Sequence, residues 1–359
     1  MVGNYLIIAG RSLLKRKFFS FLNIFGLALA LAVCLVIWTY VEFERSYDSF
    51  NEKSDRIFRI LSTIYSDEQQ LVEVGYDLVP ALSNSIPEIK NYVRIHPMYF
   101  GAVVTFEDEG NVVRFEETNT MLFVDSTFFD VFSYNLSHGD IQSALDNPSS
   151  IVLSKSAAKK YFGDKIDPLG KTLQVMGGWA DGEYQVTGVL DEVPQNSHLS
   201  FDFLLSMQNL LNTPYYKDNS RWDSFATYVE LDSTADLGTV ESKMPTFLEN
   251  YLGPEADPNH KADIILQRVT DIHLAEASSS KGVINSNYFL ILISVFILII
   301  AWINYINLST SLAAERVKEV AIKKSIGASR KQLMIQFFVE SLVINFVAIF
   351  IAVALAYIA

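Results

Sequence analysis

The sequence predicts α-helical transmembrane segments joined to a large mixed α/β domain outside the cytoplasm. Half of the 359 residues are hydrophobic and the mean hydropathy is +0.21, which is high for a purely soluble chain. Three long apolar runs account for this excess, at residues 18–41, 288–308 and 333–359. The long stretch between the first two runs, 42–287, has the mixed composition of a folded domain.

The first apolar run is Phe18 to Val41, which contains no charged residue. As a helix it would be roughly 36 Å long at ~1.5 Å per residue, and a bilayer core is ~30 Å thick. It exceeds the ~7–15 apolar residues of a signal peptide, and no small-x-small cleavage site follows it. We therefore predict that residues 18–41 cross the membrane. Residues 1–17 are a cytoplasmic or interfacial helix, or the span begins early; both alternatives remain open.

The second run, residues 288–308, is also uncharged, and Glu340 alone interrupts the third run, residues 333–359. A charge at mid-bilayer costs ~2.5–3.5 kcal/mol on insertion scales. Glu340 therefore has either a structural role facing other helices or a role in coupling. Asn304 and Asn307 share one helical face, and we expect them to form interhelical hydrogen bonds.

The basic residues beside the runs predict the topology. Four of them precede the first run without any acidic residue, and six lie between the second and third runs. Short loops rich in Lys and Arg stay in the cytoplasm. The N-terminus and residues 309–332 should therefore be cytoplasmic, in a multi-pass protein of the cell inner (plasma) membrane. The domain at 42–287 lies opposite, and it holds 38 of the 41 acidic residues and 18 of the 28 basic ones.

Several classes of function are excluded by composition and spacing. A net charge of −13 argues against a nucleic-acid partner, and a single cysteine excludes disulfides and cysteine-rich zinc sites. No two histidines have metal-binding i, i+4 spacing, and G-x-S-x-G is absent. Gly170-Lys171-Thr172 lacks the earlier P-loop glycine, because Lys165 holds that position. We predict no catalytic, cofactor-binding or metal residues, and hence a protein that is not an enzyme.

Within residues 42–287 the pattern is mixed α/β. Residues 55–60 and 184–189 alternate like half-buried strands. A further strand at 151–153 should lead to Ser154, which would cap a helix at 155–162 that ends at Gly163. Residues 236–251 suggest another helix, which Pro245 should kink or split.

Residues 313–333, which cover most of the cytoplasmic loop at 309–332, are predicted to form a helix, a sharp break and the start of another helix. Glu319 and Lys323 have the favourable i, i+4 spacing. Gly327 suits the left-handed position after a helix, and Ser329 with Gln332 fits a capping box. An ordinary basic loop that only sets the topology is the alternative.

The run from Glu315 to Leu333 resembles the pattern E-x-x-x-E-[IV]-[AG]-[IL]-[RK]-[RK]-x-[IL]-G-A-S-[RK]-x-x-[IL] of MacB/FtsX-type ABC transporter permeases. Tyr47-Asp48-Ser49-Phe50 and Thr270 to Leu274 resemble parts of that family's periplasmic core domain. The likeness extends over essentially the whole chain. Family halves carry four spans, so the chain is expected to be truncated within the third span or to be the first half of a longer permease.

This resemblance implies a permease subunit that couples ATP hydrolysis by a cytoplasmic ABC ATPase subunit to movements of its extracytoplasmic domain. The implied cargo is antimicrobials or peptides for efflux, or lipoproteins. Further implied partners are the lipid bilayer, a second permease half or homodimer, and a periplasmic adaptor; no cofactor is implied. The implied coupling element comprises Glu315, Arg316, Lys318, Glu319, Lys323, Gly327 and Ala328. A membrane-anchored extracytoplasmic sensor or structural protein without transport is the alternative.

Overall fold

The computed structural model describes residues 17–63, 71–213, 223–253, 262–279, 286–311 and 313–359, together with residues 7, 10, 11, 13–15 and 216. The chain divides into two compact units. We call Met1–Arg45 with Glu276–Ala359 the helical unit, and Ser46–Ala275 the sheet unit. The predicted helix within residues 1–17 lies mostly outside the described residues.

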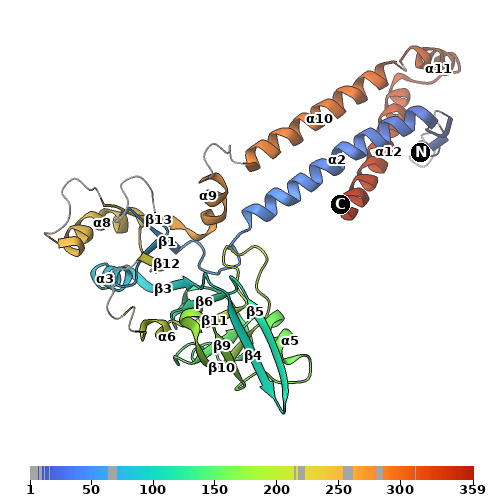
Figure 1. Cartoon of the computed structure of the whole chain (residues 1–359). Helices are drawn as coiled ribbons and strands as arrows, with labels where there is room; N and C mark the ends of the chain where they lie inside the picture. Colours follow the sequence, from blue (N-terminus) through green and yellow to red (C-terminus); the bar gives the residue numbers. More distant parts are fainter. Residues whose placement is uncertain are drawn as a thin grey trace. The chain divides into compact units, whose positions relative to one another are not determined.

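The helical unit contains α2 (Lys17–Arg45), α10 (Ser286–Ser311), α11 (Ala313–Ser325) and α12 (Arg330–Ile358). Three of its helices are long and apolar enough to cross a membrane: Lys17–Arg45, Asn287–Ser311 and Arg330–Ile358. In Figure 1, α2 runs alongside both α10 and α12, and short α11 joins α10 to α12 at one end. A hairpin of two long apolar helices joined by a charged short one follows directly from the composition of these segments.

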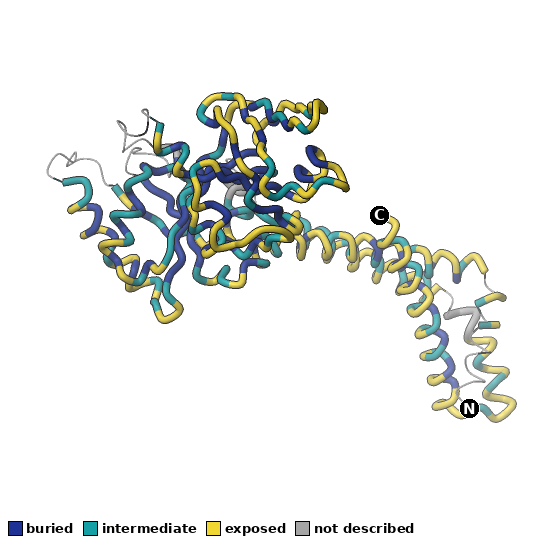
Figure 2. Tube along the Cα trace, turned by 90° about the horizontal axis from the view of Figure 1, so that it is seen from below, coloured by how far each residue is buried: buried dark blue, intermediate teal, exposed yellow. Residues whose placement is uncertain are grey.

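Small residues form the contact between α2 and α12. Ala28 and Ala32 pack against Ala348 and Ala352, and all four are buried. Alanine allows two helix backbones to approach closely, which is how helices associate where lipid removes the hydrophobic driving force. Several larger apolar residues, among them Leu31 and Ile351, pack around this alanine seam. Most of the remaining helical surface in Figure 2 is exposed or intermediate.

The sheet unit contains thirteen described strands that form a single mixed sheet. The strands are β1 (Ile57–Ser62), β2 (Glu73–Gly75), β3 (Ile89–Pro97), β4 (Ala102–Asp108), β5 (Asn111–Glu117), β6 (Met121–Val124), β7 (Leu136–Gly139), β8 (Ser150–Leu153), β9 (Thr172–Met176), β10 (Gly182–Leu190), β11 (Phe203–Ser206), β12 (Asp223–Leu231) and β13 (Ile264–Arg268). Their order is β13-β1-β12-β3-β6-β11-β8-β10-β9-β4-β5, with β2 beside β12 and β7 beside β10. Strands from both ends of the unit are thus neighbours, because β1 pairs with β12 and β13.

Short helices cover this sheet. They are α3 (Leu78–Ser85), α4 (Phe128–Val131), α5 (Lys155–Phe162), α6 (Met207–Leu211), α8 (Leu237–Leu252) and α9 (Ile272–Ser279), with 3-10 turns η1 (Gly178–Ala180) and η3 (Val269–Asp271). α3 and α8 share one core with β1, in which Leu82 and Met244 are buried. A second core is rich in aromatic rings, including Phe128, Phe132 and Tyr228. A third surrounds α5 and the strands near it.

The structure confirms some local predictions and corrects others. Ser154 accepts a hydrogen bond from the Ala157 N–H at 3.1 Å, and Gly163 ends α5 with φ +67°. Pro245, however, lies inside α8, which continues unbroken to Leu252; packing of Val240, Met244 and Leu248 on one face holds the helix together. The half-buried pattern predicted for the first strand is also wrong. All six residues of β1 are buried, because this strand lies between β12 and β13.

Candidate functional site

The connection between α11 and α12 is a rigid turn. The Gly327 N–H bonds to the Lys324 carbonyl and the Ala328 N–H to the Lys323 carbonyl, each at 3.0 Å. Gly327 has φ +97°, a conformation that favours glycine. Ser329 and Gln332 then form both hydrogen bonds of a capping box. The predicted helix, break and helix are therefore confirmed.

Lys323 braces this turn. Its Nζ lies 2.7 Å from Glu319 Oε1 and 3.0 Å from Gln336 Oε1 on α12. The first contact confirms the predicted i, i+4 pair. The second was missed by sequence reasoning, because Gln336 belongs to the next helix. Of the residues implied for coupling, Lys323 thus fixes the angle between the two helices and offers little charge to a partner.

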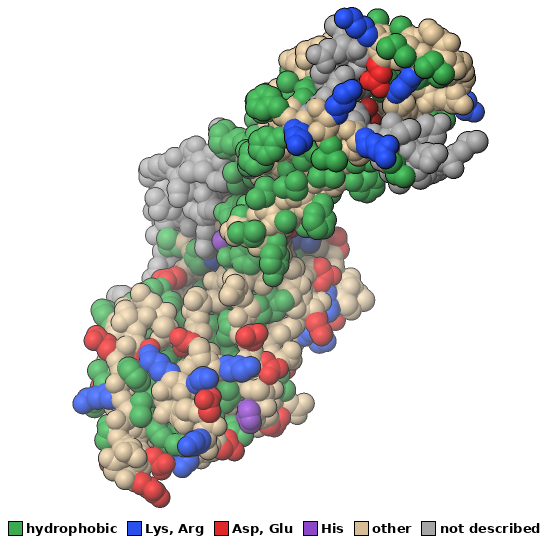
Figure 3. All heavy atoms as spheres, turned by 90° about the vertical axis from the view of Figure 1, so that its right-hand side faces the viewer, with side chains coloured by type: hydrophobic (Ala, Val, Ile, Leu, Met, Phe, Trp, Pro, Cys, Tyr) green, Lys and Arg blue, Asp and Glu red, His purple; other side chains and the backbone are tan. Residues whose placement is uncertain are grey.

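The outer face of α11 combines charge with exposed apolar side chains. Lys318 and Lys324 are exposed, as are Val317, Ile322 and Ile326, the last with 81% of its surface accessible. Figure 3 shows Lys and Arg side chains gathered at the α11 end of the helical unit, beside a hydrophobic middle. Exposed apolar groups among charges are typical of a protein-binding surface. Glu315 and Arg316 lie in α11, but their side chains are outside the described part of the structure.

Polar side chains are buried in the first parts of α2 and α12, ahead of the alanine seam in sequence. Glu340 is only 6% exposed, and Gln336, Ser20 and Asn23 are also buried. Glu340 therefore faces the helix bundle.

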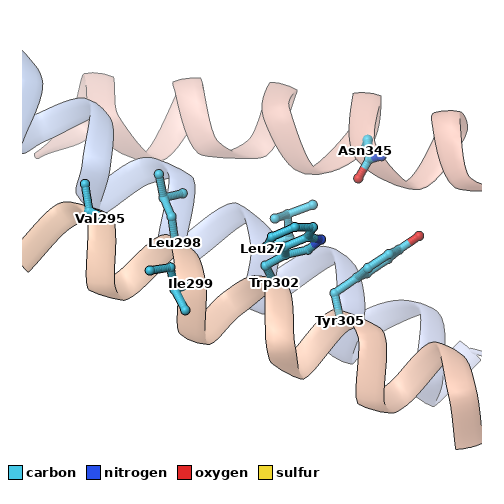
Figure 4. A pocket seen from close by; sticks show the side chains of 7 residues that line it. All are labelled: Leu27, Val295, Leu298, Ile299, Trp302, Tyr305 and Asn345. Carbon is cyan, nitrogen blue, oxygen red and sulfur yellow. The ribbon is translucent and has the colours of Figure 1, made fainter.

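The two asparagines of α10 lie at its surface. Asn304 and Asn307 are exposed, and a Cβ added to Gly26 on α2 would be 3.9 Å from Asn304 Nδ2. Near them α2, α10 and α12 line a groove of about 420 Å³ (Figure 4), with Trp302 and Tyr305 on α10 and Asn345 on α12. The remaining lining is apolar. Such a surface suits hydrocarbon better than water.

In the sheet unit, the segment that directly follows α2 in sequence is firmly anchored. Asp48 is 1% exposed, and its Oδ1 lies 2.8 Å from Nδ1 of His198. His198 Nε2 is 2.8 Å from the hydroxyl of Tyr228 on β12. The Asp48 N–H also bonds to the carbonyl of Asn196, whose side chain donates back to Ser46. These bonds join the start of the unit to a loop about 150 residues further along the chain and to the centre of the sheet.

A second anchor follows a few residues later. Lys53 Nζ lies 3.0 Å from Oε2 of Glu230, a fully buried carboxylate on β12 that also accepts a bond from Asn91 at 2.8 Å. Lys53 donates as well to the Asp130 carbonyl at 2.6 Å. Removing one partner of a buried ion pair is strongly destabilising. Residues 48–53, which we call the anchored segment, are therefore fixed to β12 at two points.

The two ends of the sheet unit also meet. The rings of Tyr47 and His273 are stacked, with centroids 3.4 Å apart and planes within 3°. The chain therefore enters and leaves this unit at one place. Within the described ranges no group of three His, Cys, Asp or Glu side chains could hold a metal ion.

Family models match most of the chain. Residues 20–247 match the MacB-like periplasmic core domain, and residues 291–359 match the FtsX-like permease C-terminal domain. Together with a mixed α/β unit and apolar helices, these matches define a membrane permease of the ABC transporter class. The chain belongs to the MacB/FtsX-type permease family.

Curated relatives agree with this assignment. The uncharacterized ABC transporter permease YknZ of Bacillus subtilis is 25% identical over 57% of this chain and 47% of its own length. The macrolide export ATP-binding/permease protein MacB of Agrobacterium fabrum is 23% identical, over 65% of this chain and 34% of its own length. The chain thus spans less than half the length of either relative.

Among solved structures, the periplasmic region of MacB from Actinobacillus actinomycetemcomitans matches with a TM-score of 0.43 and 16% identity. That match covers 64% of this chain and 95% of the other. The family assignment rests on the two family models.

Proposed function

We propose that this chain is the membrane subunit of an ABC exporter, and that a cytoplasmic ABC ATPase drives it by pushing on α11. The observation that carries the proposal is the outer face of α11, where basic and apolar side chains are exposed on a helix held at a fixed angle to α12. A rigid helix with an exposed mixed surface can transmit a push, whereas a flexible basic loop could not.

The topology in this proposal follows from the basic flanks of the helices. The N-terminus and α11 are cytoplasmic, and Ser46–Ala275 lies outside the inner membrane. Glu315, Arg316, Lys318, Glu319, Lys323, Gly327 and Ala328 form the coupling element, in which Lys323 and Gly327 set the shape while Lys318 and Lys324 offer charge to the ATPase. Glu340 is buried on α12, the helix that follows this element.

Movement passes outward along α2. This helix shares the alanine seam with α12 and continues in sequence into the anchored segment, which is fixed to β12 through Asp48 and Lys53. A push on α11 thereby reaches the central sheet without any channel for cargo through the helices. The chain itself then carries out no catalysis, and a second permease half or second copy completes the membrane part.

The direction of transport follows from the relatives. Two are named for export, of macrolides in Agrobacterium fabrum and of pyoverdine in Pseudomonas syringae. We therefore propose that small antimicrobials or peptides leave the cell with the help of this chain, or that lipoproteins are handled, with a periplasmic adaptor as a further partner.

The first test reverses one exposed charge on α11. Lys324→Glu in the full chain should lower recovery of a stoichiometric P-loop ATPase after cross-linking in native membranes by about tenfold, because one close charge pair is worth a kcal/mol or more. Lys323→Glu is less informative, since it also breaks the brace to Gln336. Lys90→Glu, on an exposed site of β3, is the matched control. Equal recovery of the ATPase with Lys324→Glu and Lys90→Glu would contradict the coupling role of α11.

The topology is tested separately by labelling. With Cys34 replaced by alanine, a cysteine at position 324 should react only with reagents applied from the cytoplasmic side, and one at position 90 only from the other side. Reaction of both positions from one side would remove the basis of the proposal.

A further inference from the structure

The sheet unit contains a groove with basic side chains, and none of the residues that line it belongs to the anchored segment. It encloses about 640 Å³ between β7, α5, the connection after α5 and β10. Sites for small molecules usually enclose about 300–1,000 Å³ and combine an apolar lining with a few polar groups. The groove is therefore large enough for an organic molecule.

Basic residues are unusually dense in this part of an acidic domain. Five of the 18 basic residues between positions 42 and 287 fall within residues 155–171. Two of the five are held by acids elsewhere, since Lys160 bonds to Glu117 at 2.6 Å and Lys171 lies 3.6 Å from Asp108. The other three, Lys155, Lys159 and Lys165, line the groove.

The acids of the groove offset only part of its positive charge, because three lysines and two aspartates line it. Lys159 is 3.1 Å from Asp164, but both side chains are highly exposed, so the pair is weak. The Asp167 carboxylate accepts a hydrogen bond from the Leu169 N–H at 3.0 Å, within the same turn of the chain. Among the ion pairs of the described residues, none involves Lys155 or Lys165. Two lysines of the groove lining are thus outside any direct ion pair of the described residues.

The remaining lining has both polar and apolar parts. His138 Nδ1 lies 3.1 Å from Ser137 Oγ, which donates to the carbonyls of Val189 and Leu190 and therefore accepts from the imidazole. This hydrogen bond leaves Nε2 as the free nitrogen of the ring. Val189 and Ala158 supply a buried apolar floor.

We propose that this groove binds a small organic anion, with a carboxylate or phosphate group on Lys155 and Lys165 and an apolar body on the floor formed by Ala158 and Val189. Lysine is a compact charge with three donors and suits either anionic group. The surrounding domain is acidic, so an anion gains attraction here that it would not find over most of this surface.

The test uses phenyl phosphate as the probe and calorimetry on the full chain in nanodiscs of zwitterionic lipid. We expect saturable binding that is weaker for inorganic phosphate, which lacks the ring, and absent for benzyl alcohol, which lacks the charge. Lys155→Gln and Lys165→Gln should each weaken binding about threefold to tenfold, since each removes one charge-assisted contact. Lys90→Gln, outside the groove, should leave it unchanged.

The proposal is overturned if phenyl phosphate does not saturate, or if the groove variants and Lys90→Gln behave alike. Nanodiscs with phosphatidylglycerol distinguish the source of the anion. If the affinity for phenyl phosphate is unchanged in these nanodiscs, the natural ligand is a soluble anion. If phosphatidylglycerol competes with phenyl phosphate, the site binds a lipid headgroup, and the proposal of a soluble ligand is overturned. Because this binding experiment needs no ATPase, a negative result would leave the exporter proposal intact. A negative result in the ATPase cross-linking experiment would likewise leave the groove proposal intact.

Discussion

The sheet unit keeps its largest side chains inside, whereas the helical unit keeps them outside. Phe128 and Tyr228 are almost completely buried among other rings in the sheet unit, while Trp302 and Phe350 of the helical unit are 66% and 78% exposed. In the helical unit, most of the buried residues are alanines or polar, with a few aliphatic ones such as Leu333 and Ile344. The contrast indicates that the sheet unit folds in water and that the helical unit is surrounded by hydrocarbon. Water drives aromatic rings into a core, and hydrocarbon leaves them at the surface so that small residues can bring the helices together.

The largest effect should come from truncating an aromatic residue in the sheet unit. Phe128→Ala removes a ring that contacts Phe132, Tyr134 and Phe201, and such changes cost about 3–5 kcal/mol. Hydrogen exchange by mass spectrometry should show faster exchange in the strands of the sheet unit. Exchange in α2 and α12 should not change; a loss of protection there would break the comparison.

An intermediate effect is expected from acid. His96 is buried, its Nε2 is 2.9 Å from the Tyr216 hydroxyl and its Nδ1 has no partner among the described residues. Burial lowers the pKa of His96 to about 4. The unfolded chain, with a pKa near ~6.5, therefore takes up this proton first, and stability falls between about pH 6.5 and pH 4 by about 3 kcal/mol.

The loss of stability in acid is measured by denaturant unfolding of the full chain at a series of pH values. His96→Gln should remove the contribution of this residue, so the difference in stability between the two proteins should depend on pH only in that window. A constant difference from pH 7 to pH 4 would show that His96 is not protonated on unfolding.

The smallest effect should come from overpacking the alanine seam. Ala348→Leu adds three carbon atoms where α12 meets α2, and overpacking costs about 1–3 kcal/mol. Spin labels on α2 and α12 should move apart. Val353→Leu, on an exposed position of α12, is the control and should leave the distance unchanged. Equal distances in both variants would mean that close packing does not hold these helices.

Local features of the chain could be predicted from sequence, and long-range ones could not. Ser154 and Gly163 bound α5, and Gly327 with Ser329 bounds the turn after α11, because caps depend on residues within one helical turn. The apolar runs are equally local. By contrast, nothing near Asp48 in sequence indicates that His198 will contact it, since the two meet only after the sheet has formed.

The contacts of the candidate site were likewise predictable only where they are local in sequence. The Glu319 pair with Lys323 was predictable from spacing, but the bond from Lys323 to Gln336 crosses between two helices. Ser20 and Asn23 gave one usable signal, because they are three residues apart in an otherwise apolar run and so share a helical face. Their burial beside α12 required the alanine seam to be known.

The stacked rings of Tyr47 and His273 have a practical consequence for producing or exchanging the sheet unit on its own. A polypeptide whose two ends lie in contact can be excised, closed with a few glycine and serine residues, or exchanged for a foreign module, with little change in loop entropy. Residues 46–275 are in this sense a cassette carried between two membrane helices. Under the proposed function, exchange of this cassette would change what the outer domain handles and would leave α11, with its exposed basic and apolar face, unaltered.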